Sequence, residues 1–442
     1  MTRILLKGGC VLTLGARSQN LPRGDVLVED DRVVEVGTIL RARDAEQVDA
    51  SDTIVMPGFV DSHRHVWTSL FRNLGDGDPR TAVRAPAWVV GDHYGAEDVY
   101  AATLVGLLGA AEAGITTVVD WCEFGISGEH TDAALTAHED AGLRTIFVHA
   151  CATGAESAIR WRSQLGRLAA SARNPLTGLA AGPAEPQPDA AEQVASDWAV
   201  AREFGLRIHT AAGMSASAAG VVSDLAARHL LGRDVTLVHC SHLDAADLDA
   251  VAATGTSISV TPSADMAAGV PLPPVQRLID RGIRIGLGIG SERLAPGDLF
   301  AQIRAVISIQ HATYFDLKLA GRAGLPRLLT TREVIRYGCI DGANAVGLGK
   351  ITGSLEPGKQ ADIVLLRADR PNIFPVNDPI GAVVWGMDTS NVDWLFVAGR
   401  AVMRDGELDA DLDRVRELTV AAQRRLVSSS GLAAATGAGD PS

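Results

Sequence analysis

Two histidines one residue apart stand at the end of an apolar segment, which reads Met56-Pro57-Gly58-Phe59-Val60-Asp61-Ser62-His63-Arg64-His65. Alternate residues of a strand point to the same face, so His63 and His65 share a face and Arg64 points away. Neutral imidazole nitrogens are common ligands of divalent metals. The spacing therefore predicts that His63 and His65 can reach one metal ion.

Two further histidines, His209 and His239, each end a short apolar segment. Such segments alternate with helical stretches rich in Ala and Leu, which indicates parallel βα units. Eight of them are found, near residues 54–62, 115–121, 144–150, 178–182, 206–210, 235–240, 256–261 and 284–290. Eight strands close a (β/α)8 TIM barrel, whose reacting groups lie at the carboxyl ends of the strands. The four histidines all fall at such ends.

The segment from Val55 to His65 resembles the first metal motif of the amidohydrolase superfamily, in its deaminase and chlorohydrolase branch acting on cyclic C–N compounds. The resemblance continues in order along the chain, at residues 97–100, 113–121, 207–209, 235–240 and 353–364. It implies a metal, Zn²⁺ or Fe²⁺, held by His63, His65 and His209. It also implies that His239 approaches the attacking water or the substrate, and that the protein is a homodimer.

The chain departs from this family at two carboxylates. Gly290 stands where the family has an aspartate at the end of strand eight, and Ala212 stands where the branch commonly has a glutamate. We therefore expect weak or absent metal binding, and Gly290→Asp could restore a ligand if the ancestral geometry persists. Glu292 and Glu123 are the candidate replacements for acid–base work. No lysine occurs between Lys7 and Lys318, which excludes a carbamate bridging two metals and favours a mononuclear site.

Other residues near the predicted strand ends could shape a substrate pocket. Two tryptophans offer flat apolar surfaces suited to a ring. An arginine could hold a substrate carboxylate. The candidate substrate-binding residues are Trp67, Arg72, Trp121 and His149.

Composition describes a globular protein whose partner is a small molecule. The 442 residues are 47% hydrophobic and 21% charged, with a net charge of −13, which argues against nucleic acid and anionic membranes as partners. We expect a cyclic, nitrogen-containing substrate. The chain shows neither a signal-peptide pattern nor a long apolar run, and its five cysteines are scattered, so we expect a cytoplasmic bacterial protein with reduced thiols.

The two ends of the chain share a pattern of short alternating strands. We predict that residues 1–56 and 351–405 form one β-sandwich, and that residues 57–350 form the barrel. Residues 406–442 are expected to be a C-terminal helix followed by a mobile tail rich in small residues.

Three functions remain open from the sequence. The leading hypothesis is hydrolysis or deamination of a heterocyclic C–N bond at a mononuclear metal. The alternative is a metal-poor or metal-free cyclase, lyase or isomerase that uses the same pocket for proton transfer. The third is a small-molecule binding protein without catalysis.

Overall fold

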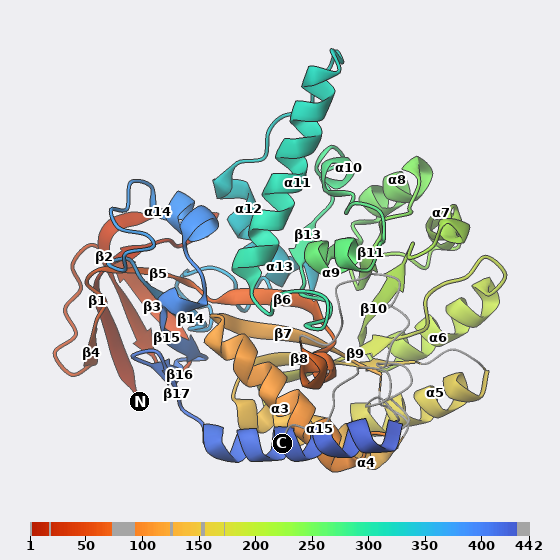
Figure 1. The fold of residues 1–442 in the computed structure, drawn as a ribbon, viewed down its shortest axis with the longest axis horizontal. Coiled ribbons are helices and arrows are strands. Elements are labelled where there is room, and N and C mark those ends of the chain that lie inside the picture. The colour runs from red at the N-terminus through yellow and green to blue at the C-terminus, as the bar shows by residue number, and fades with distance from the viewer. Residues whose placement is uncertain are drawn as a thin grey trace.

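The computed structural model describes residues 2–16, 19–72, 93–123, 127–151, 155–171 and 173–430. A sheet built from both chain ends packs beside a larger α/β body (Figure 1). The predicted fold class, a parallel barrel with a β-domain from the two ends, is confirmed. The expected tail, residues 431–442, and most of the loop between Arg72 and Tyr94 lie outside the described residues.

The β-domain is one mixed sheet of nine strands, in which β5 joins the two chain ends. β5 pairs in parallel with β1 and antiparallel with β14, so the first and last parts of the chain share one ladder. Its strands are β1 (Arg3–Val11), β2 (Leu21–Glu29), β3 (Arg32–Gly37), β4 (Glu46–Asp49), β5 (Thr53–Pro57), β14 (Ile363–Arg367), β15 (Val392–Val397), β16 (Arg400–Arg404) and β17 (Glu407–Leu408).

The barrel consists of eight parallel strands that follow one another in chain order. They are β6 (Phe59–Arg64), β7 (Ile115–Cys122), β8 (Arg144–Ala150), β9 (Thr177–Gly182), β10 (Arg207–Ala212), β11 (Val235–His239), β12 (Ser257–Val260) and β13 (Ile285–Leu287). β6, β7 and β8 are buried at every position, as expected for parallel strands that are covered on both faces.

The first predicted strand, residues 54–62, is divided in the structure. Residues before Gly58 belong to β5 of the β-domain, and the barrel strand β6 begins only at Phe59. A Cβ atom at Gly58 would lie 2.2 Å from Thr116 Cγ2, so only glycine allows the chain to pass from one sheet to the other here. The apolar run hides this division because both strands are buried.

The barrel is closed by Gly290, which follows β13. The Gly290 N–H donates to the His63 carbonyl at 2.9 Å, and the Gly290 carbonyl accepts from the His65 N–H at 2.7 Å. These two bonds form a parallel bridge between Gly290 and Arg64. The seam of the barrel therefore lies directly behind the H-x-H motif.

Most of the described helices cover the barrel. The bounds of all of them are η1 (Val66–Phe71), α3 (Ala96–Glu112), α4 (Gly128–Ala141), α5 (Ala155–Ala170), α6 (Ala191–Glu203), η2 (Ala216–Ala218), α7 (Val221–Ala227), α8 (Ala245–Thr254), α9 (Pro262–Ala267), α10 (Val275–Ile279), α11 (Leu299–Leu319), α12 (Thr331–Tyr337), α13 (Ile340–Ala345), α14 (Pro379–Gly381), η3 (Ala382–Gly386), η4 (Thr389–Asn391) and α15 (Leu412–Ser430). The far end of α11 projects from the body (Figure 1). The C-terminal helix α15 lies along α3, where Arg425 donates to the buried Asp98 at 2.6 Å.

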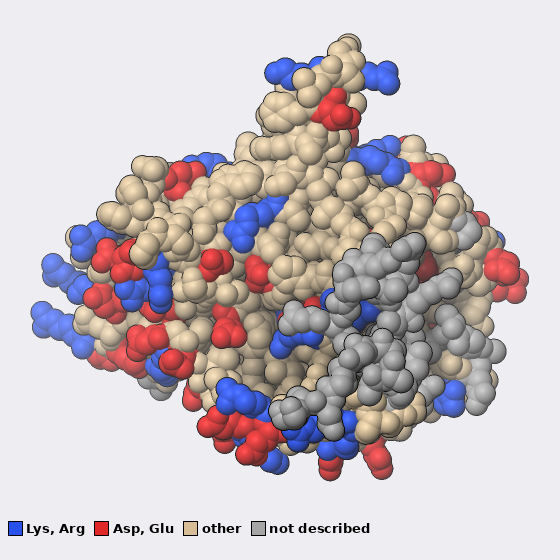
Figure 2. All heavy atoms as spheres, in the orientation of Figure 1, with Lys and Arg blue, Asp and Glu red and all other residues tan. Residues whose placement is uncertain are grey.

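On the face shown in Figure 2, basic and acidic side chains are interspersed over the β-domain and along α15. Among the described helices, none has the length and apolarity needed to cross a bilayer.

Candidate functional site

The four histidines meet inside the barrel, where His63 and His65 lie at the end of β6, His239 ends β11, and His209 is the third of the six residues of β10. His63 Nε2 lies 3.3 Å from His65 Nε2, and His63 Nδ1 lies 3.2 Å from His209 Nε2. The ring of His239 is 5.6 Å from that of His63, centre to centre. Residues from three strands thus form one cluster at the end of the barrel where TIM-barrel enzymes place their reacting groups.

The backbone of β6 is shaped to bring both imidazoles inward. Pairing between β6 and β7 is irregular between Asp61 and Arg64, which re-aims the side chains that follow. On the opposite side, β13 approaches so closely that a Cβ atom at Gly288 would lie 2.6 Å from the His63 carbonyl oxygen. Glycine at this position therefore leaves room for the backbone that carries His63.

The chemistry of the cluster fits a divalent metal. Burial, followed by the neighbouring His65, His209 and His239, lowers the pKa of His63 well below its ordinary value. Burial and the Arg207 charge lower the pKa of His209 to about 3. Both rings are therefore neutral near pH 7, as metal ligation requires.

The ring nitrogens that could bind a metal are close together, but they do not point to one common position. Ligands about 2.0–2.1 Å from a tetrahedral zinc are roughly 3.3 Å apart, which matches the spacing of these nitrogens. However, His63 turns Nε2 to His65 and Nδ1 to His209, and one ring cannot offer both nitrogens to one ion. Accordingly, no three ligating side chains form a ready metal site within the described residues. A metal would require His63 to reorient.

Glu123, a predicted acid–base residue, lies behind His65. Its Oε2 is 3.6 Å from His65 Nδ1, and its Oε1 accepts from Trp121 Nε1 at 3.1 Å. A carboxylate on the far nitrogen of an imidazole fixes the orientation of the ring and leaves Nε2 for the metal side. This position suits Glu123 to orient His65.

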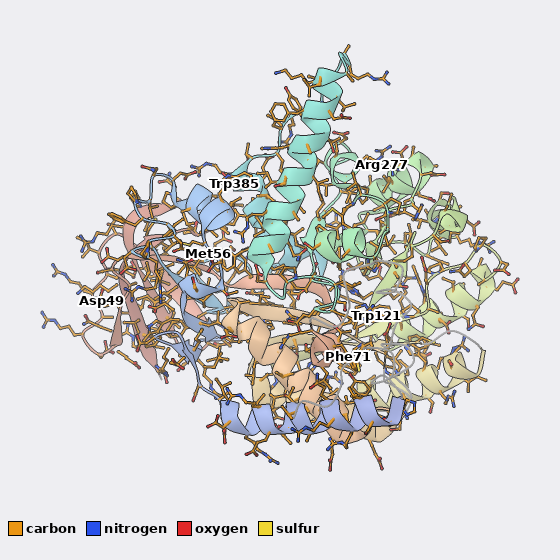
Figure 3. The ribbon with its side chains drawn as sticks, viewed as in Figure 1. Asp49, Met56, Phe71, Trp121, Arg277 and Trp385 are labelled. Carbon is orange, nitrogen blue, oxygen red and sulfur yellow. The ribbon has the colours of Figure 1, made fainter. Side chains whose placement is uncertain are left out.

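Trp121, labelled in Figure 3, lies beside the cluster at the end of β7. Its ring is 5.7 Å from His63 and 6.0 Å from His209, centre to centre. The structure thus brings this predicted substrate-binding residue to the imidazoles. It provides an apolar wall next to them.

His239 has an unusual backbone and a carboxylate partner. Both His239 (φ 69°) and Cys240 (φ 61°) adopt the left-handed conformation, which costs on the order of 1–3 kcal/mol for each residue that is not glycine. His239 Nδ1 lies 2.7 Å from Asp265 Oδ1 and 3.1 Å from Thr261 Oγ1. Although burial lowers the pKa of His239, the charge and hydrogen bond of Asp265 outweigh burial, and the pKa is raised.

Asp265 was missed by the sequence analysis. It belongs to the short helix α9, which starts directly after β12, and Thr261 Oγ1 donates to its Oδ1 at 2.8 Å. An acidic residue in the first turn of a helix is ordinarily explained by the helix dipole. The available signal was its position four residues after Thr261, near the end of the seventh barrel strand.

In the structure Glu292 and Arg72 contact each other, and Glu292 also contacts Arg64. Glu292 Oε1 is 2.6 Å from Arg64 Nη2, Glu292 Oε2 is 2.8 Å from Arg72 Nη2, and Ser69 also donates to Oε2. Despite burial, the Arg64 and Arg72 charges lower the pKa of Glu292. These contacts make a buried ion cluster that fixes the segment after His65, and we no longer propose catalytic or substrate-binding roles for the two residues.

His149 and Trp67, two predicted substrate-binding residues, lie in different surroundings. His149 lies on the outer face of β8, where its ring stacks on Trp161 of α5 at 6.4 Å, and burial lowers its pKa to about 4. His149 thus packs a helix against the barrel. Trp67 is buried with Tyr94 between η1 and α3, but its ring also lies 6.5 Å from that of His65, centre to centre, so its role in substrate binding stays a prediction.

A cavity of about 150 Å³ lies inside the barrel below His209. Most of its lining comes from the first residues of the strands, such as Gly178 and Arg207. It is therefore in the amino-terminal half of the barrel, and we assign the chemistry to the imidazole end instead.

A model of the amidohydrolase family matches residues 54–402, so the chain belongs to this family and the resemblance seen in the sequence is confirmed. A 5′-deoxyadenosine deaminase of Methanothermobacter thermautotrophicus is 27% identical, over 96% of this chain and 98% of the relative. A 5-methylthioadenosine/S-adenosylhomocysteine deaminase of Symbiobacterium thermophilum is 28% identical, over 92% and 94%. Family and relatives together identify an enzyme of the hydrolase class that includes deaminases.

Solved structures share the fold. An atrazine chlorohydrolase from Arthrobacter aurescens TC1, complexed with zinc, superposes with a TM-score of 0.82 at 23% identity, covering 95% of this chain and 100% of the other. An adenosine deaminase from Xanthomonas campestris with bound zinc gives 0.81 at 20% identity, covering 97% and 99%. At identities of 20% and 23%, this structural similarity supports the fold of the chain alone.

Proposed function

We propose that this protein hydrolyses a C–N bond of a cyclic, nitrogen-containing small molecule, most simply by removing an exocyclic amino group. The observation that carries the proposal is the convergence of His63, His65, His209 and His239 at one end of the barrel in an amidohydrolase. Deaminases among the relatives support the reaction type.

His63, His65 and His209 are the residues that would hold a divalent ion such as zinc. The ion would supply Lewis acidity, which activates water near pH 7 and polarises the attacked bond. Glu123 keeps His65 oriented for this role through its contact with Nδ1. Trp121 provides an apolar wall beside the imidazoles and excludes water from one side of the pocket.

His239 is the candidate proton carrier. Its Nδ1 is engaged by Asp265, so Nε2 is the nitrogen left to face a reacting group. General acid–base catalysis of this kind contributes about 10²–10⁴-fold to a rate. Neither Gly290 nor Ala212 can supply a side-chain carboxylate for this step.

The first experiment measures metal content and turnover together. We would purify wild type and His63→Ala, measure zinc and iron by elemental analysis, and assay ammonia release before and after chelation and zinc addition. We expect close to one metal per chain after zinc addition to wild type, with activity lost on chelation. Full activity of metal-free His63→Ala would overturn the metal-dependent hydrolase.

The second experiment addresses the substrate. The relatives suggest a panel of 5′-deoxyadenosine, 5′-methylthioadenosine, S-adenosylhomocysteine and adenosine, with atrazine as a chlorinated triazine. Release of ammonia indicates deamination, whereas release of chloride from atrazine indicates dechlorination. We expect ammonia from an aminated ring. Turnover of none of these, with elimination or isomerisation of another cyclic compound, would contradict the proposal.

Three features of the site favour a second candidate function, proton transfer without a metal. The nitrogens of His63 face two different neighbours, and the strand-eight carboxylate is missing while a histidine–aspartate pair is present. A lyase or isomerase could use that pair alone. The same metal and turnover measurements separate the two functions, because only the hydrolase loses activity on chelation.

A further inference from the structure

Asp265 and His239 form a buried pair at the end of the barrel where the catalytic groups gather. The Asp265 side chain is almost fully buried, and its Oδ1 lies 2.7 Å from His239 Nδ1. An ionised carboxylate can only accept hydrogen bonds, so the proton of this contact belongs to Nδ1. The pair therefore fixes the tautomer of His239 and leaves the lone pair of Nε2 for the pocket.

Thr261 completes the pair. Its hydroxyl donates to Asp265 Oδ1 at 2.8 Å and lies 3.1 Å from His239 Nδ1. The other oxygen, Asp265 Oδ2, is buried and has no hydrogen-bond partner among the described residues. Since a buried carboxylate oxygen without a partner is costly, Oδ2 is suited to accept a hydrogen bond from an atom of a bound molecule.

The Asp265–His239 pair lies close to Gly290, the residue at the end of strand eight that has no side chain. A Cβ atom at Gly290 would lie 3.0 Å from Ala264 Cβ and 3.1 Å from Thr261 Cβ, which are neighbours of Asp265 in and before α9. The absence of a side chain at Gly290 thus lets α9 lie against the end of β13. This packing holds Asp265 where it can reach His239.

We propose that Asp265 is the positioning residue of this enzyme: it orients His239 for proton transfer, and His239 so oriented takes over the proton-handling task of the carboxylate that Gly290 lacks. The proposal rests on the hydrolytic function proposed above. In a deamination, the water oxygen bonds to the ring carbon as one of its protons passes to His239 Nε2. The C–N bond then breaks, and His239 returns this proton to the leaving amino group. The second water proton ends on the ring nitrogen, so ammonia and a cyclic amide are formed.

The test compares Asp265→Asn with wild type and with a matched control, Asp247→Asn. Asp247 is likewise buried, but it caps α8 and binds the backbone of Gly220 and Ser223. In metal-free, ¹⁵N-histidine-labelled protein, the ring nitrogen shifts of His239 report which nitrogen carries the proton. His239→Gln assigns the signal. Kinetic constants and metal content are measured on the zinc-loaded proteins.

We expect wild type and Asp247→Asn to show the Nδ1-protonated ring, and Asp265→Asn to show a mixed or reversed tautomer. We expect kcat of Asp265→Asn to fall about 10²-fold or more, with KM and metal content little changed. An unchanged tautomer in Asp265→Asn, or a kcat equal to that of Asp247→Asn, would overturn the proposal. If wild type releases no ammonia from any substrate, the hydrolytic function fails, while the ring nitrogen shifts still decide whether Asp265 sets the tautomer.

Discussion

The Cα atom of Gly290 faces Thr261 so closely that a Cβ atom added to it would lie 3.1 Å from the Thr261 Cβ. Gly290 also has a φ of 71°, a backbone conformation that residues other than glycine rarely adopt. The position where the sequence resemblance implies an aspartate is thus crowded by Thr261 and by Ala264 of α9. This relationship argues against a simple restoration of an aspartate there.

We predict that Gly290→Asp lowers stability and native activity instead of raising metal content. The strain at φ of 71° and the contact with Thr261 should cost about 1–3 kcal/mol of unfolding free energy. Denaturant unfolding and elemental analysis measure the two effects. Gly282→Ala is the matched control, because Gly282 also has a positive φ, 64°, but no neighbour within 4 Å. Equal destabilisation of both variants would show that the contact with Thr261 is unimportant.

We predict that Glu123→Gln weakens metal binding about 10–100-fold by loosening the orientation of His65. The carboxylate lies 3.6 Å from His65 Nδ1, and the amide would lose its charge while keeping its size. Competition with a zinc-binding dye measures the affinity. Trp121→Phe removes the other partner of Glu123 but keeps the carboxylate, so its affinity should change less. A Glu123→Gln affinity equal to wild type contradicts this role.

We predict that Glu292→Gln lowers the unfolding free energy by about 3–5 kcal/mol, since it removes the close anionic partner of the buried Arg64 and leaves two longer contacts, to Asp61 and to the Gly297 carbonyl, both at 3.4 Å. The lowered pKa of Glu292 sets the pH dependence. Its stabilisation is fully present above the ordinary glutamate pKa and is lost as the pH falls through the lower folded value. Urea unfolding from pH 3 to 7 should show a steeper acid loss in wild type than in the variant.

We predict that His149→Phe leaves activity at pH 7 nearly unchanged and improves stability in acid. Burial lowers the pKa of His149 to about 4, so the unfolded chain binds more protons than the folded one below the ordinary pKa of about 6.5. Wild type should therefore lose roughly 3 kcal/mol between pH 6.5 and 4 from this residue. Melting temperatures across this range test it. A large loss of kcat at pH 7 would contradict this prediction and would indicate that His149 contributes to the substrate pocket.

The sequence predicted the architecture well because strand ends and apolar periodicity depend on local pattern. It located His63, His65, His209 and His239 through the rule that barrel chemistry lies at the carboxyl ends of strands. The same rule did not place His149 correctly, because residues at a strand end point alternately into the barrel and out to the helices, and the rule does not say which. In the structure His149 pairs with Cys122, whereas Trp121 pairs with Val148 on the inner face, and this register depends on tertiary pairing.

The sequence also could not predict which charged residues contact one another. Glu292 and Arg72 are 220 positions apart in the chain, yet they share hydrogen bonds. Asp265 and His239 come from different βα units and meet only when β11 and β12 pair. Such contacts depend on how loops and short helices pack on the barrel, and the periodicity of apolar residues in the sequence does not predict this packing.

The joining of both chain ends in one sheet bears on how the protein is made on the ribosome. β5 needs β14 as a neighbour, and α3, beside the site, needs α15 with its Arg425–Asp98 ion pair. Because a ribosome releases the amino-terminal part of a chain first, β5 and α3 must wait with exposed apolar surface until residues 363–430 have been synthesised. Completion of the imidazole site is therefore coupled to the synthesis of residues 363–430, and chains stopped before α15 should be bound by chaperones and degraded.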